Sequence, residues 1–82
     1  MAYDIDVGPV REALDELPRP ALVAFAAALA VLEATPWSGD PLVDANPGGA
    51  VRTLPFGGTG LITYVVLEQF VRVDVLQVHW VG

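Results

Sequence analysis

One histidine and two arginines are the side chains in this 82-residue chain best suited to acid–base and anion chemistry. Histidine titrates near neutrality when unperturbed, which makes His79, the single histidine, the candidate general acid. Arg52 and Arg72 fall in segments with strand character, and an arginine can stabilise negative charge that develops in a transition state. The alternative interpretation is structural, with a histidine near a frayed chain terminus and two arginines paired with Asp74 or other carboxylates.

Other classes of chemistry are disfavoured by the composition. The chain has no cysteine, which excludes disulfides and thiolate catalysis, and a single histidine argues against a zinc site. The run Gly57-Gly58-Thr59-Gly60 lacks the lysine and the following helix of a phosphate-binding loop, so a hairpin turn is the better interpretation. We therefore expect no metal ion and no cofactor.

Charge and hydropathy limit the partners. The formal net charge is −6, with four arginines and no lysine, which argues against unspecific binding to nucleic acid. The longest apolar run, Ala21–Leu32, is too short to span a bilayer, and the acidic residues before it do not fit a secretory leader. We expect a cytoplasmic protein without membrane contact. The apolar fraction of 54% is high for a small domain and indicates a surface that a partner covers.

The carboxyl-terminal half is expected to form a three-stranded antiparallel meander. The predicted strands are Val51–Phe56, Leu61–Leu67 and Phe70–Trp80. The glycine run joins the first two, and Glu68-Gln69 joins the last two, and short connections of this kind make hairpins.

The last strand predicts a β-bulge. Strict alternation from Val71 would place Gln77 and His79 on the apolar face, where unpaired polar groups cost a few kcal/mol in total. An extra residue near Val75–Leu76 shifts the phase once and removes the conflict. The face toward the helices then holds Val71, Val73, Val75, Val78 and Trp80. The open face holds Arg72, Asp74, Gln77 and His79.

The amino-terminal half predicts a strand and two helices. Tyr3–Val7 alternates as a half-buried strand, and Pro9–Leu17 has one apolar stripe. The second helix, Ala21–Ala34, is apolar on nearly all sides, and we expect its sheet-facing stripe to be Leu22, Phe25, Ala26, Leu29 and Leu32.

The segment from Thr35 to Gly49 is rich in proline, glycine, aspartate and asparagine and is predicted to be a long loop. Such a loop is either functional or a plain connector held down by Trp37 and Leu42. The tryptophans Trp37 and Trp80 are expected to pack in the core or an interface rather than to stack on bases. The whole chain is predicted to be one α+β domain of order β-α-α-β-β-β, with the amino-terminal strand in the sheet and both helices on one face.

This order of elements resembles the RelE/ParE superfamily of type II toxin–antitoxin toxins over nearly the whole chain. A helical hairpin (VREALDELP, then PALVAFAAALAVLEATPW) follows the first strand. A strand with a basic residue (AVRTLPF), a glycine turn, a strand with Tyr64 (LITYVV) and a last strand ending in VHW complete the pattern.

The resemblance implies a toxin-like protein, in its ribonuclease form a metal-independent, ribosome-dependent endoribonuclease that cuts messenger RNA. In that form His79 would protonate the leaving 5′-oxygen, and Arg72 or Arg52 would stabilise the charge on the phosphorane. Arg52 can join the other two only if its strand presents it on the open face. Leu61 stands where such ribonucleases carry an arginine, and the chain is acidic where they are basic, so we expect weak activity or none.

The alternative is a non-catalytic RelE/ParE-fold protein that acts by protein–protein binding. It would be either a ParE-like target inhibitor or a relic that only pairs with an antitoxin. The resemblance implies an antitoxin-like partner in every case. For the ribonuclease form it also implies the ribosome and messenger RNA as partners. We also expect the isolated chain to associate, as a homodimer or with a short partner.

Overall fold

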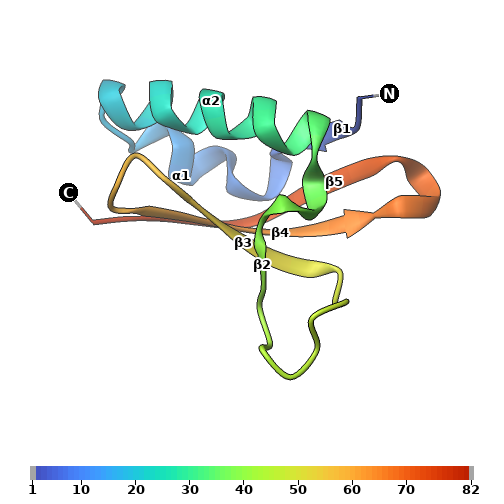
Figure 1. Ribbon diagram of the computed structural model, residues 1–82. Coiled ribbons are helices and arrows are strands. Elements are labelled where there is room, and N and C mark those ends of the chain that lie inside the picture. Colours follow the sequence, from blue (N-terminus) through green and yellow to red (C-terminus); the bar gives the residue numbers. More distant parts are fainter. Residues whose placement is uncertain (1, 82) are drawn as a thin grey trace.

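A computed structural model describes residues 2–81 of the chain. Its centre is a five-stranded sheet of order β1-β5-β4-β3-β2 (Figure 1). The strands are β1 Asp4–Asp6, β2 Asp40–Pro41, β3 Val51–Phe56, β4 Gly60–Leu67 and β5 Arg72–Trp80. Strand β1 runs parallel to β5, and all other neighbours are antiparallel, which confirms the predicted meander and the place of the amino-terminal strand.

Both helices lie on one face of the sheet, as predicted (Figure 1). A 3₁₀ turn, η1 Gly8–Val10, leads into the short helix α1 Arg11–Asp15, and the long helix α2 spans Arg19–Ala34. The first helix is shorter than the predicted Pro9–Leu17. A proline makes the helical conformation unfavourable for the residue before it, and Leu17 precedes Pro18. Among the described residues no helix has both the length and the apolar character needed to cross a bilayer.

The segment after α2 is more ordered than the predicted loop. A 3₁₀ turn, η2 Pro36–Ser38, precedes β2, which pairs with β3 so that Asp40 lies opposite Thr53. The Leu42 amide also donates to the Val51 carbonyl at 3.0 Å. A strand of two residues that includes a proline has no periodicity, so the sequence pattern could not indicate it.

The connection between β4 and β5 is longer than the predicted two residues. Glu68–Phe70 form a 3₁₀ turn, η3, and Val71 follows in the left-handed conformation with φ 49°. Phe70 and Val71 are therefore exposed turn residues rather than strand residues, and the prediction that Val71 faces the helices is wrong. A β-branched residue rarely adopts this conformation, so its residue type favoured a strand.

The predicted bulge in β5 is present. Thr63 on β4 pairs with Gln77 and the next residue, Tyr64, pairs with Val75, so Leu76 is the extra residue. Beyond the bulge His79 is exposed while Trp80 packs against the core. The phase shift therefore separates the polar from the apolar residues of β5 as expected.

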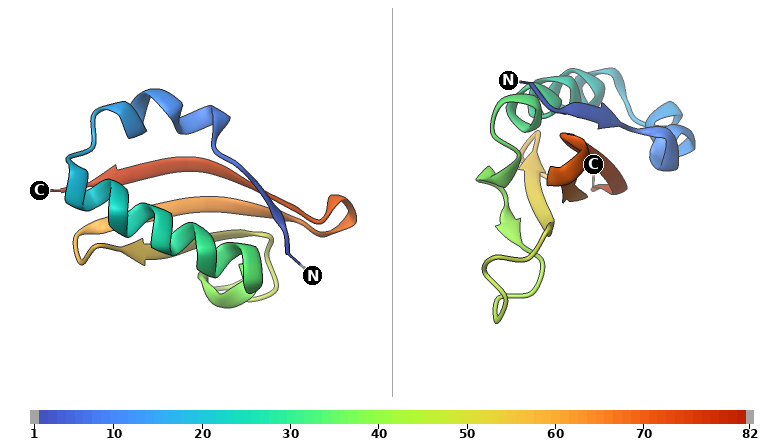
Figure 2. Two further views of the ribbon diagram at one scale, coloured as in Figure 1. Left: turned by 90° about the horizontal axis from the view of Figure 1, so that it is seen from above. Right: turned by 90° about the vertical axis from the view of Figure 1, so that its right-hand side faces the viewer.

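Helix α2 lies over the sheet (Figure 2), and the core side chains lie between the sheet and the helical segments on this face. Phe25 of α2 meets Phe56 of β3 edge to face at 5.7 Å between ring centroids, and Trp80 lies 5.5 Å from Phe56. The buried stripe of α2 is Ala21, Phe25, Ala28 and Leu32. The predicted stripe was wrong at Leu22 and Ala26, which are exposed. Both stripes share Phe25 and Leu32, and the small alanines at the other two positions let the helix approach the sheet closely.

The β3–β4 turn should be sensitive to added side chains. Gly57 and Gly58 have φ of +61° and +83°, and a Cβ on Gly57 would come within 2.8 Å of the Trp80 ring. We expect Gly58→Ala to lower the free energy of unfolding by ~1–2 kcal/mol through the backbone alone, and Gly57→Ala to lower it further. Gly48→Ala is the matched control, because it has open space and no positive φ. Urea denaturation that ranks all three equally would contradict the turn geometry.

Candidate functional site

The open face of the sheet carries two of the three candidate catalytic residues. The alternation of β5 after its bulge places Arg72 and His79 on the side away from the helices, with Asp74 and Gln77 between them. His79 lies beside Leu61 of β4, and both side chains are exposed. The predicted membership of the open face is therefore correct.

Arg72 and His79 stand at opposite ends of this face. Arg72 pairs with Leu67 and His79 pairs with Leu61, and these partners are six residues apart on β4. At ~3.3 Å per residue their backbones are about 20 Å apart. A proton donor and a cation that act on one phosphate must both lie within hydrogen-bond distance of it. The structure does not bring these two residues together.

The charge of Arg72 is already balanced. Its Nε lies 2.9 Å from Asp74 Oδ1 and its Nη2 lies 3.3 Å from Oδ2, a two-pronged contact on the surface. The guanidinium also lies over the Phe70 ring at 5.8 Å. This is the structural arrangement that the sequence allowed as the alternative for Arg72.

Arg52 lies on the other face. It is paired with Tyr64 in the sheet, points to the helix-covered side and is only 8% exposed. Its Nη1 donates to the Gly39 carbonyl at 2.8 Å, and its Nη2 donates to the Pro47 carbonyl at 2.6 Å. The guanidinium stacks over the Trp37 ring at 4.7 Å. The condition for Arg52 to join the other two residues is therefore not met.

Tyr64 completes the cluster around Arg52. Its hydroxyl donates to the Pro36 carbonyl at 2.7 Å and accepts from the Gly39 amide at 3.1 Å. Burial raises the pKa of the Tyr64 phenol, so it stays a neutral donor at physiological pH. A Cβ at Gly39 would overlap both this hydroxyl and the Thr53 carbonyl. Arg52 and Tyr64 together fix the path of the chain from η2 into the loop after β2.

A second polar cluster centres on Glu68 in η3. One carboxylate oxygen accepts hydrogen bonds from the Trp37 indole and from the Tyr3 hydroxyl, the latter at 2.7 Å. The hydrogen bond from Trp37 contributes most to lowering the pKa of the Glu68 carboxyl, and the hydrogen bond from Tyr3 lowers it further. The Tyr3–Glu68 hydrogen bond in turn raises the pKa of the Tyr3 phenol. Tyr3 is 65 positions from Glu68 in sequence, so no local pattern could have indicated the cluster.

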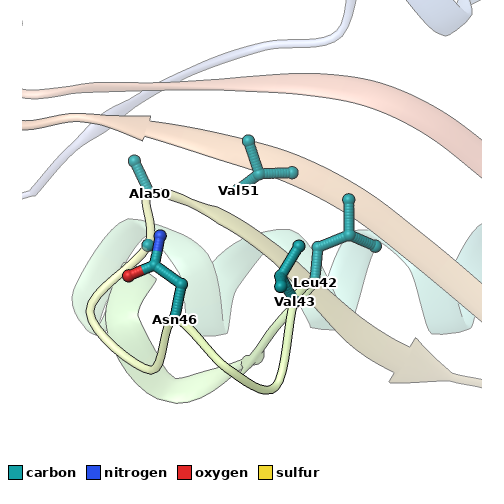
Figure 3. Close-up of a pocket in the computed structure, with 6 residues that line it drawn as sticks. Leu42, Val43, Asn46, Ala50 and Val51 are labelled. Atoms are coloured by element: carbon teal, nitrogen blue, oxygen red, sulfur yellow. The ribbon is translucent and has the colours of Figure 1, made fainter.

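The loop after β2 forms an apolar hollow. It has a volume of about 200 Å³ and is lined by Leu42, Val43, Asn46, Gly49, Ala50 and Val51 (Figure 3). Asn46 supplies the only polar side chain of this lining, and none of the lining residues can carry a charge. The hollow suits an apolar side chain of a partner and has no group for acid–base chemistry. Among the described residues no three histidine or acidic side chains gather in a way that could hold a metal ion.

Comparison with solved structures identifies the fold. The chain superposes on a chain of the toxin–antitoxin complex RelBE2 from Mycobacterium tuberculosis with a TM-score of 0.82 and 23% identity, over 99% of this chain and 93% of the other. It therefore has the fold of RelE toxins, which confirms the resemblance in fold. No family model and no curated protein matches the sequence.

Two structures from Escherichia coli agree. A double arginine-to-alanine mutant of toxin RelE in the free state gives a TM-score of 0.74 and 19% identity, over 98% of this chain and 84% of that one. The intact RelBE toxin–antitoxin complex gives 0.74 and 17%, over 99% of both chains.

The two arginines of the sheet should differ in their effect on stability. Arg52→Met removes a buried donor from two carbonyls, and we expect it to lower the free energy of unfolding by ~2–4 kcal/mol. Arg72→Met removes a partly exposed surface pair and should cost less than ~1 kcal/mol. Urea denaturation of both variants checks this. Equal losses would show that the Arg52 hydrogen bonds contribute little.

Glu68 should make stability depend on pH. Because its pKa in the folded protein is lowered from 4.5, its contribution is present above pH 4.5 and is lost as the pH falls through the folded value. Glu68→Gln keeps an acceptor for Trp37 and Tyr3 but removes the charge. The stability advantage of the wild type over this variant should shrink as the pH is lowered below 4.5, measured by urea denaturation at each pH. A difference that stays constant would contradict the charged hydrogen bonds.

Proposed function

We propose that this protein is the toxin-like component of a toxin–antitoxin module and that it acts by binding protein partners rather than by cutting RNA. The fold of RelE toxins supports the first part of the proposal. The separation of the candidate catalytic residues supports the second.

The observation that carries the proposal is the position of the three charged side chains. A general acid at His79 has no arginine within reach, because Arg72 stands about 20 Å away and Arg52 lies on the other face. Arg52 is also bonded to the chain's own carbonyls, and Arg72 is bonded to Asp74. Within residues 2–81 neither of these arginines is therefore preorganised to stabilise charge on a phosphorane beside His79.

The surface supports a protein partner. Large apolar side chains are exposed around the open face and the loop, with Leu42 at 55%, Val43 at 57% and Leu61 at 40% exposure. Two of the structures that share this fold are toxin–antitoxin complexes. An antitoxin-like segment, extended or helical, with apolar side chains for this surface and the hollow beside Val51 is the partner we propose.

The second candidate is the metal-independent, ribosome-dependent endoribonuclease. The likeness to RelE toxins and the exposure of His79 favour it. Within residues 2–81 the His79 ring has no hydrogen-bond partner, so it is free to meet a substrate. The ribosome or the messenger RNA complex would then have to supply the cation that the chain does not place there.

Replacing His79 separates the two candidates. The binding function predicts that His79→Ala leaves any growth effect of the expressed chain unchanged at equal protein abundance, with the ends of cellular messages unaltered. General-acid catalysis predicts a loss of ~10²–10⁴-fold in cleavage. Gln77→Ala, a neighbouring exposed change on the same face, is the matched control.

New message ends that appear with the wild type and the control but not with His79→Ala would overturn the binding proposal. A growth effect relieved by co-expression of an adjacent short reading frame, whose product copurifies with this chain, supports the toxin–antitoxin part. A chain with no growth effect and no copurifying product would contradict that part.

A further inference from the structure

The outer face of α2 is apolar between its two ends, Arg19 and Glu33. Within residues 2–81 no other helix or strand lies over this side of the helix (Figures 1 and 2). Its exposed apolar residues are Leu22, Val23, Ala26, Ala27, Ala30, Val31 and Ala34. A helix that faces water on one side normally carries charged residues there. This face is therefore built for contact with another surface.

Charge is confined to the two ends of the face and differs in sign. Arg19 begins α2 and Glu33 is its penultimate residue. The two positions are about four helical turns and about 21 Å apart, so they lie on nearly the same side of the helix. Within residues 2–81 neither side chain forms an ion pair. Such a face is complementary to a copy of itself that runs in the opposite direction.

The shapes of the two ends are also complementary. The amino-terminal end carries Leu22, which is 39% exposed, and Val23, which is 66% exposed. The other end has a shallow hollow of about 340 Å³ lined by Ala2, Ala30, Glu33 and Ala34. When two copies lie antiparallel, the large side chains at the amino-terminal end of one α2 face the hollow at the carboxyl-terminal end of the other.

We propose that α2 is the contact of an antiparallel homodimer with its two-fold axis at Ala26. In this register Arg19 of one copy meets Glu33 of the other, and Leu22 meets the hollow at Ala30. The alanines at the centre let the two helix backbones approach closely. Parallel pairing would instead set Arg19 against Arg19 and Glu33 against Glu33. The two-fold symmetry makes each contact occur twice.

The contact is of limited size. One pair of helices buries less than the ~1,600 Å² of a standard interface, so we expect a reversible dimer in the micromolar range. Because the face is separate from the open side of the sheet, this inference does not depend on the proposed function.

Sedimentation equilibrium of the full chain with charge-reversal variants tests the dimer. Arg19→Glu and Glu33→Arg should each weaken it, by about tenfold, because each creates two like-charge contacts. The double variant Arg19→Glu/Glu33→Arg should restore the wild-type dissociation constant. Arg11→Glu, an exposed reversal on α1, is the matched control and should leave it unchanged.

A change at the axis gives a second test. Ala26→Glu keeps a good helix former at an exposed position but sets two carboxylates against each other, so the chain should stay folded by circular dichroism and become monomeric. A wild type that is monomeric up to high micromolar concentration would overturn the proposal. So would a dimer that Ala26→Glu leaves intact, or a double variant as weak as either single one.

Discussion

The single extra residue in β5 determines which side chains of that strand lie on the open face of the sheet and which face the helices. Because Leu76 has no partner opposite it, the strand changes phase once, and its polar residues beyond that point turn to the open side. Without this shift Gln77 and His79 would point at the helices and bury unpaired polar groups at a cost of ~1–3 kcal/mol each. The bulge also aims Trp80 at Phe56, where it closes the core at the end of the glycine turn. The exposure of the only histidine is thus a consequence of core packing.

The same sheet keeps the arginines apart. Arg52 serves the fold: its guanidinium, buried between Trp37 and the carbonyls of Gly39 and Pro47, holds the segment that carries the apolar hollow. A cation with fewer donors could not hold both carbonyls in this geometry. Arg72 lies on the surface, where the Asp74 carboxylate balances its charge. The fold is that of RelE toxins, and in the free chain Arg52, Arg72 and His79 lie at three separate places in its sheet.

Sequence reasoning reached the fold because the strands obey simple rules. The strand Val51–Phe56 ends where the glycine run begins, and the bulge near Val75–Leu76 follows from alternation and from the cost of buried polar groups. For α2 the prediction was correct at Phe25 and Leu32 and wrong at Leu22 and Ala26, because the small alanines at 21 and 28 pack against the sheet instead. The residue type of Val71 gave no sign of its left-handed conformation, and the sequence did not decide on which face of the sheet Arg52 lies. The hydrogen bonds of Glu68 join residues that only the folded chain brings together.

The distance between positions 72 and 79 is the most direct test of the central claim, that the sheet holds the candidate catalytic residues apart. The chain has no cysteine, so Arg72→Cys/His79→Cys can carry two spin labels without other changes. Double electron–electron resonance on the free protein should give a narrow distribution centred on or above about 20 Å, with a broadening set by the tethers. A main population below about 15 Å would place the two positions close enough for their side chains to act on one phosphate and would contradict the account.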